Sequence, residues 1–446
     1  MFEFDPRHAE ALSLQSDELL KGARVTDAPA PRPQHPVENP IYPVFTATRE
    51  HLIGIPNFFE RVLTGDGEEI GRFWNVNGKR VGWEGESFQK IKQLSADLAV
   101  RKPLTDLVSV EFVMNEVFEW LKESLEQRCA ETLADRLARR CEAEVKEVEI
   151  WIPMHQTYAK APFKLGSVTF KPITKEMMEK WYGRIDVSNN PEVKAAKVRE
   201  RSRLQATLAA CSIVRAEPKK ASQVAFERAI EASSLLRFLS EANWSCKIRS
   251  YVVPSGMERE DSAHELIVAN GEIKVMASRA LRSVTAAWNV DRNKHLLPGL
   301  LEHLDALASD PTSTELRKSL LETLLIYAKN NLTLDPAEKL VFVLVSLESL
   351  LLRNDSEPIQ SNLADRLAFL VGNTLEERKE IVAATRKTYA LRSKFVHHAR
   401  AIEDETLVDK FLDYAWQALA NILVSLDKFE SRENLISWLN DRKLTG

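Results

Sequence analysis

The sequence is poor in cysteine and glycine. Its 446 residues include four cysteines, none in C-x-x-C spacing: Cys129, Cys141, Cys211 and Cys246. This argues against a zinc knuckle or a disulfide framework and favours reduced, buried thiols. The 15 glycines form no G-x-x-x-x-G-K-[ST] loop, and the histidines show no metal-ligand spacing. We therefore expect neither a metal nor a cofactor.

A long apolar run is also absent. The longest, residues 340–352 (LVFVLVSLESLLL), is too short to span a bilayer and contains Glu348. The first ten residues, MFEFDPRHAE, lack the basic start and the apolar stretch of a secretory signal. These two observations predict a cytoplasmic protein without a membrane partner.

Carboxylates are missing from one segment near the C-terminus, although the whole chain has a net charge of −4. Between Ile381 and Arg400 the side chains that carry or can carry positive charge are Arg386, Lys387, Arg392, Lys394, His397, His398 and Arg400. A cationic cluster of this kind in an acidic chain can bind a phosphate-bearing partner. The alternative is a solvated helix face, and composition alone favours it.

The pattern along the chain predicts an α+β protein with three regions. Residues 1–104 begin with a proline-rich strap, because six prolines stand between positions 28 and 43, and then become β-rich. Residues 105–310 mix strands with long helices, and residues 311–446 are helical. Two Asn-Gly pairs, at 77–78 and 270–271, each predict a β-hairpin. Residues 193–240 are expected to be helical, with a break near Pro218.

The C-terminal region shows the clearest helix signals. Asp335 followed by Pro336 predicts a helix start, with Glu338 closing a capping box. This helix is apolar on nearly all sides, which is typical of the central helix of a bundle. A second capping box, from Thr374 to Glu377, opens the helix that carries the cationic segment. Four helices with short connections predict an antiparallel bundle.

Helical geometry limits what the cationic segment can do. Residues five apart, such as Arg392 and His397, point about 140° away from each other on one helix. Ser393 and His397 are one turn apart, so the serine hydroxyl can orient the imidazole. For Arg392 and His397 to act together, either the helix must end between them or a second copy of the chain must complete the site.

An arginine followed by four residues and a histidine, late in a helical bundle, resembles the signature of the HEPN superfamily. Three blocks, residues 342–352, 363–372 and 389–399, resemble the Apea-like HEPN branch in order and spacing. The resemblance covers about residues 313–440. It implies a HEPN four-helix bundle that pairs with itself and cleaves RNA without a metal. It places the catalytic pair at Arg392 and His397.

The residue types suit that chemistry. Histidine titrates near neutral pH and can serve as base or acid, while arginine offers a fixed, charged fork to phosphate. A symmetric dimer would bring two histidines and two arginines into one cleft. Glu348, on an apolar helix, is expected to be buried and paired with Arg392 or Arg366, and so to hold the catalytic arginine. A purely structural ion pair is the alternative for Glu348.

The remaining cationic residues are expected to bind RNA: Arg386, Lys387, Lys394, His398 and Arg400. Ser393 follows the arginine where active relatives commonly carry Asn, Asp or His, and serine looks common in the Apea-like branch. The His-His pair can instead cap the last carbonyls of its helix and interact with the helix dipole.

The resemblance therefore predicts a metal-independent endoribonuclease that acts as an effector of an anti-phage or toxin-type system. By analogy with HEPN effectors, the part before residue 311 would recognise a phage or cellular trigger or select the target. Two alternatives stay open. One is a catalytically inactive HEPN module that binds nucleic acid or a protein partner. The other is a scaffold whose bundle serves dimerisation alone.

Overall fold

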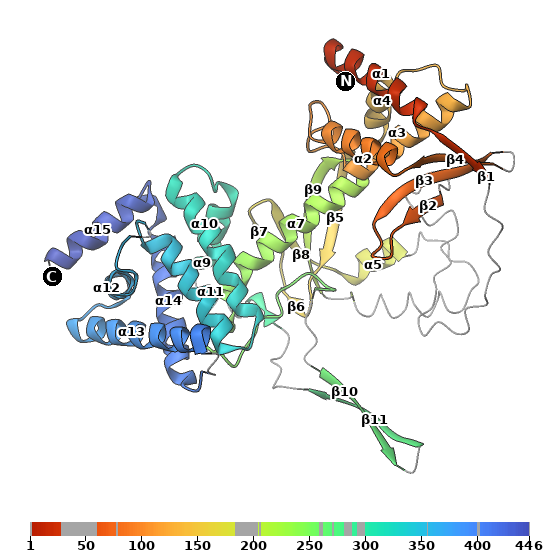
Figure 1. Ribbon diagram of the computed structural model, residues 1–446. Coiled ribbons are helices and arrows are strands. Elements are labelled where there is room, and N and C mark those ends of the chain that lie inside the picture. Colours follow the sequence, from red (N-terminus) through yellow and green to blue (C-terminus); the bar gives the residue numbers. More distant parts are fainter. Residues whose placement is uncertain are drawn as a thin grey trace. The chain divides into compact units, whose positions relative to one another are not determined.

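The protein combines helices with small sheets (Figure 1). Two four-stranded sheets are built from strands that end by residue 216, and the described residues from 299 onward are helical. The computed structural model describes residues 2–27, 60–76, 79–182, 204, 207–257, 262–269, 272–280, 288–291, 299–354, 356–398 and 402–445. The chain forms two compact units, Met1–Val148 with Ile213–Val224, and Glu149–Ser212 with Ala225–Gly446. The predicted α+β class is confirmed, because the chain contains both helices and sheets. The proline-rich segment 28–43 lies outside the described residues.

The first unit contains a four-stranded sheet in the order β1-β4-β3-β2. Its elements are α1 (Pro6–Lys21), β1 (Arg24–Asp27), β2 (Glu60–Leu63), β3 (Glu69–Val76), β4 (Lys79–Glu84), α2 (Glu86–Ala99), α3 (Val110–Leu125) and α4 (Leu133–Glu144). Val76 pairs with Lys79, so the hairpin predicted at residues 77–78 is confirmed, although the two turn residues are not described. Trp83, Phe88 and Phe118 are fully buried and form aromatic contacts in the core of this unit.

Gly82 in β4 allows a close approach between β4 and β3. A Cβ atom at this position would lie 2.0 Å from the carbonyl oxygen of Arg72 and 2.7 Å from the Cα of Phe73. Because both atoms belong to the backbone, Gly82→Ala is expected to lower the free energy of unfolding by about 3 kcal/mol. Denaturant unfolding followed by tryptophan fluorescence would measure the loss.

Gly65→Ala is the matched control, because a Cβ atom there would meet nothing within 4 Å. Its free energy of unfolding is expected to stay within about 0.5 kcal/mol of the parent. Equal unfolding midpoints for the two variants would contradict the close approach at Gly82.

The second sheet has the order β5-β9-β8-β7. Its strands are β5 (Lys146–Pro153), β7 (Phe163–Leu165), β8 (Val168–Pro172) and β9 (Leu208–Ala216). The prediction of a helix through residues 193–240 is wrong for β9. Five consecutive residues, 208–212, are buried, and a strand buried on both faces has the same continuous apolar sequence as a buried helix. Pro218 starts α7 (Pro218–Leu236), where a proline fits well, rather than breaking a helix.

Short elements lie between the strands of this sheet and before the helical region. β6 (Thr157–Tyr158) stands between β5 and β7, and α5 (Lys175–Tyr182) between β8 and β9. β10 (Ser262–Ala269), β11 (Glu272–Ala280) and β12 (Trp288–Asn289) follow α7. Ala269 pairs with Glu272, so the hairpin predicted at residues 270–271 is also confirmed. β6 and β12 pair in parallel.

From residue 299 onward the described chain contains only helices and short turns, drawn in teal to blue in Figure 1. The helices are α9 (Leu300–Ser309), α10 (Glu315–Tyr327), α11 (Pro336–Leu351), α12 (Ile359–Val371), α13 (Leu375–His398), α14 (Glu405–Val424) and α15 (Arg432–Thr445). The four helices α11 to α14 all contact one another. No helix in the described part of the chain is long and apolar enough to cross a bilayer.

Both predicted helix starts are present, with one change of partner. The Asp335 carboxylate accepts a hydrogen bond from the Ala337 amide at 2.8 Å. Glu338 accepts from the Thr333 hydroxyl at 2.6 Å instead of closing a capping box. At α13 the box is complete: Thr374 accepts from the Glu377 amide, and Glu377 accepts from the Thr374 amide. These contacts set where α11 and α13 begin.

Candidate functional site

The predicted catalytic residues lie near the end of α13. This helix runs without a break from Leu375 to His398, so Arg392 and His397 stand on one continuous helix. Five residues correspond to a rotation of about 140°, and the two side chains therefore do not converge within one chain. Arg392 is half-buried, whereas Ser393 and His397 are exposed. Of the two arrangements that the sequence left open, a helix end between Arg392 and His397 is excluded.

Arg392 lies beside a polar pair between α11 and α13. The Tyr389 hydroxyl donates a hydrogen bond of 2.7 Å to the Glu348 carboxylate. Burial raises the pKa of Tyr389, and the Glu348 carboxylate raises it further, while the nearby Arg392 charge opposes the shift. The Nε atom of Arg392 is buried and has no hydrogen-bond partner among the described residues. A buried N–H donor without an acceptor is uncommon and calls for a functional or structural explanation.

The ion pair predicted for Glu348 is not formed. Its partner is the Tyr389 hydroxyl, and the carboxylate is half-buried rather than fully enclosed. Arg366 instead donates to both carboxylate oxygens of Glu357, at 2.7 and 2.9 Å, and to the Leu351 carbonyl at 2.6 Å. Leu351 is the last residue of α11, where the helix dipole favours a cation, and this explains why Arg366 is held there. Sequence reasoning missed Tyr389, although it lies one turn before Arg392.

The pairing of Glu357 predicts a pH-dependent contribution to stability. Hydrogen bonds from Arg366 lower the pKa of Glu357 from its ordinary value to about 2. A lowered carboxyl pKa contributes stability that is present above about pH 4.5 and is lost as the pH falls toward 2. Glu357→Gln is therefore expected to cost about 2 kcal/mol at pH 7, and this difference from the parent should shrink toward zero near pH 2.

Urea unfolding of the parent and the variant between pH 2 and 7 would measure this difference. Glu376→Gln, an exposed change in the first turn of α13, is the control and should alter stability by less than about 0.5 kcal/mol. A constant difference between the Glu357→Gln variant and the parent at all pH values would contradict the assignment.

Three of the predicted RNA-binding residues, Arg386, Lys387 and Lys394, are exposed on α13. They form no ion pair with any residue that the structure describes. His398 is the last residue of the helix, and only its backbone is described. Arg400 lies outside the described residues. The exposed cations suit both open interpretations, a solvated helix face and a phosphate-binding face.

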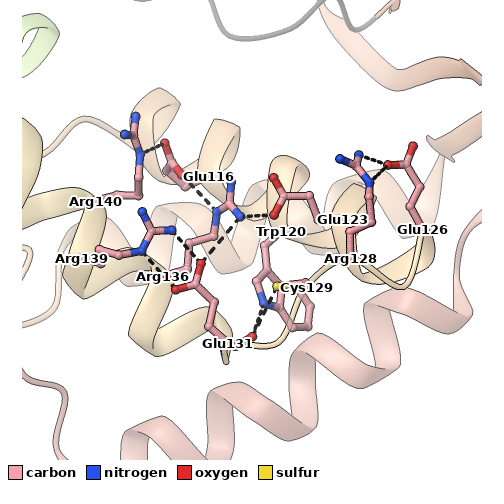
Figure 2. Close-up of polar contacts among 10 residues, drawn as sticks. All are labelled: Glu116, Trp120, Glu123, Glu126, Arg128, Cys129, Glu131, Arg136, Arg139 and Arg140. Atoms are coloured by element: carbon pink, nitrogen blue, oxygen red, sulfur yellow. Dashed lines mark hydrogen bonds and ion pairs between the residues drawn. The ribbon is translucent and has the colours of Figure 1, made fainter.

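A second group of charged side chains, which the sequence analysis did not single out, joins α3 to α4 (Figure 2). Arg136 is 8% exposed and contacts the carboxylates of Glu116 and Glu123, at 3.3 and 2.7 Å. Arg140 pairs with Glu116 at 2.9 Å, and Arg139 pairs with Glu131 at 2.7 Å. Each arginine in Figure 2 has a carboxylate partner, so this network is compensated and holds the two helices together.

No protein family model, no curated protein and no solved structure matches this chain. Within the described residues, no three His, Cys, Asp or Glu side chains are grouped so that they could hold a metal ion.

Proposed function

We propose that the protein is a metal-independent endoribonuclease of the HEPN type, whose site is completed by two copies of α13. The observation that carries the proposal is the geometry of Arg392 and His397 on one unbroken helix. One chain offers a half-buried arginine with an unpartnered Nε and an exposed histidine that faces elsewhere. A two-fold dimer with its α13 helices facing each other would bring two such sets together.

The proposed reaction uses the 2′-hydroxyl of RNA as the nucleophile. His397 of one subunit accepts the 2′-hydroxyl proton, and the new O–P bond forms as the 5′-oxygen leaves. His397 of the partner subunit donates a proton to that leaving oxygen. Arg392 stabilises the negative charge that develops on the phosphorane oxygens. The products carry a 2′,3′-cyclic phosphate and a 5′-hydroxyl.

Ser393 and Glu348 act through their neighbours in this proposal. Ser393 lies one turn before His397, and its hydroxyl orients the imidazole ring. Glu348 is a positioning residue. Its carboxylate accepts a hydrogen bond from Tyr389, and the Tyr389 ring lies close to the charge of Arg392. The exposed Arg386, Lys387 and Lys394 bind RNA phosphates on either side of the cleaved bond.

In a cell, such an enzyme would act as an effector of an anti-phage or toxin-type system, with the part before residue 311 responding to a trigger. A second candidate is a catalytically inactive HEPN module that binds nucleic acid. The exposed Arg386, Lys387 and Lys394 support this candidate as much as they support the enzyme, because they can bind nucleic acid with or without cleavage.

The chemistry of the cleaved ends tests the proposal. The purified protein, incubated with total RNA in EDTA, is expected to produce fragments with 2′,3′-cyclic phosphate and 5′-hydroxyl ends. Ligation-based mapping of both end types would measure this. Cleavage that requires added divalent metal, or fragments with 3′-hydroxyl ends, would contradict the mechanism. Binding without cleavage would favour the inactive module.

A further inference from the structure

A hollow of about 570 Å³ is lined by side chains of α12, α13 and α15. Its apolar part includes Phe369, Val382 and Ala383. The guanidinium of Arg378 lies over the Phe369 ring, 4.5 Å from the ring centroid, and adds a second flat surface. The volume lies in the range of pockets that hold small organic groups.

The rim of this hollow is positively charged. Lys379, Arg386 and Lys443 line it together with Arg378, against one carboxylate, Asp365. Asp365 forms an ion pair with Lys443. Lys379 and Arg386 are exposed and have no ion-pair partner in the described ranges of the chain. The hollow therefore favours an anionic ligand.

An exposed face of α13 leads from the hollow toward the proposed catalytic histidine. Lys379, Ala383, Arg386, Ala390, Ser393 and His397 follow one another at alternating spacings of four and three residues, and all six are exposed. This spacing places them on one face of the helix. No carboxylate occurs between Ile381 and His398. Arg386 and His397 are separated by about 16 Å along the helix axis.

We propose that the hollow is a subsite for one nucleotide of single-stranded RNA whose chain then follows α13 toward His397. An apolar floor beside a cationic rim matches a ligand with a flat base and a phosphate. The base lies against Phe369, Arg378 and Ala383, and the phosphate lies between Lys379 and Arg386. The identity of the strand as RNA rests on the proposed function, whereas the charge and the shape of the hollow do not.

The test measures binding rather than cleavage, using the full chain with His397→Ala so that the RNA stays intact. Fluorescence anisotropy with a labelled 12-nucleotide poly(U) would be recorded at several salt concentrations. Adding Lys379→Ala and Arg386→Ala is expected to weaken binding at least about tenfold and to flatten the salt dependence. Adding Ala383→Phe, which fills the hollow without changing charge, is expected to weaken binding about tenfold at an unchanged salt dependence.

The matched control is Lys318→Ala with Lys329→Ala, which removes two exposed cations that do not line the hollow. Its affinity should stay within about twofold of the His397→Ala protein. Equal losses for the control and for Lys379→Ala with Arg386→Ala would overturn the proposal, as would full affinity after Ala383→Phe. A labelled poly-glutamate peptide that binds as tightly as the RNA would also overturn it.

The proposed function and this inference can fail separately. If the parent protein cleaves no RNA but the hollow variants lose affinity, the subsite stands and the enzyme proposal falls. If the parent cleaves RNA and the hollow variants bind normally, the enzyme proposal stands and the subsite falls.

Discussion

An equal mixture of the parent protein and the His397→Ala variant, allowed to exchange subunits, is expected to cleave RNA at about one quarter of the parent rate. Random pairing leaves about one quarter of the dimers with two parent subunits. Only these dimers carry both histidines, one as the base and one as the acid. The expectation follows from the unbroken α13, which prevents Arg392 and His397 of a single chain from converging.

Initial rates at a series of mixing ratios would measure this effect. The rate should fall with the square of the parent fraction. A control mixture with the Lys318→Ala variant, which changes an exposed residue of α10, should keep the parent rate. A rate that falls linearly with the parent fraction would show that one histidine suffices, and the dimeric site would be wrong.

Replacing Arg392 by alanine is expected to lower the cleavage rate about a thousandfold, because the charge that forms on the phosphorane then has no fixed cation. Arg392→Lys should recover only part of the rate, since lysine keeps the charge but lacks the planar fork. Rates measured under single-turnover conditions with excess protein would separate catalysis from binding.

Lys394→Ala serves as the control for Arg392. Lys394 is exposed two residues further along α13, and its loss should mainly weaken RNA binding and flatten the salt dependence, with little effect on the single-turnover rate. A rate for Arg392→Ala within about threefold of the parent would remove Arg392 from the catalytic site.

Local sequence signals predicted the fold wherever the structure depends on a few neighbouring residues. The Asn-Gly pairs located two hairpins, and Asp335 and Thr374 located two helix starts, because turns and caps are set by side chains within four residues. β9 could not be predicted in this way. Its apolar residues are buried by distant strands, and a run buried on all sides has no period that separates strand from helix.

For the candidate site, the sequence determines which residues share a helix but not which side chains they contact. The spacing of Arg392, Ser393 and His397 is a local property of one helix, and the structure keeps them on α13. The partner of Glu348 depends on how α11 and α13 pack, which the sequence does not state. Tyr389 reaches that carboxylate, whereas Arg366 is held at the end of α11 by Glu357 and Leu351.

If α13 carries a metal-free RNA-cleaving site, the loss of His397 alone must abolish cleavage. The parent protein and the His397→Ala variant, prepared in parallel and shown to have the same fold by circular dichroism, would be incubated with the same single-stranded RNA in EDTA. Cleavage by the parent and none by the variant is expected. Equal cleavage by both proteins, or no cleavage by either, would contradict it.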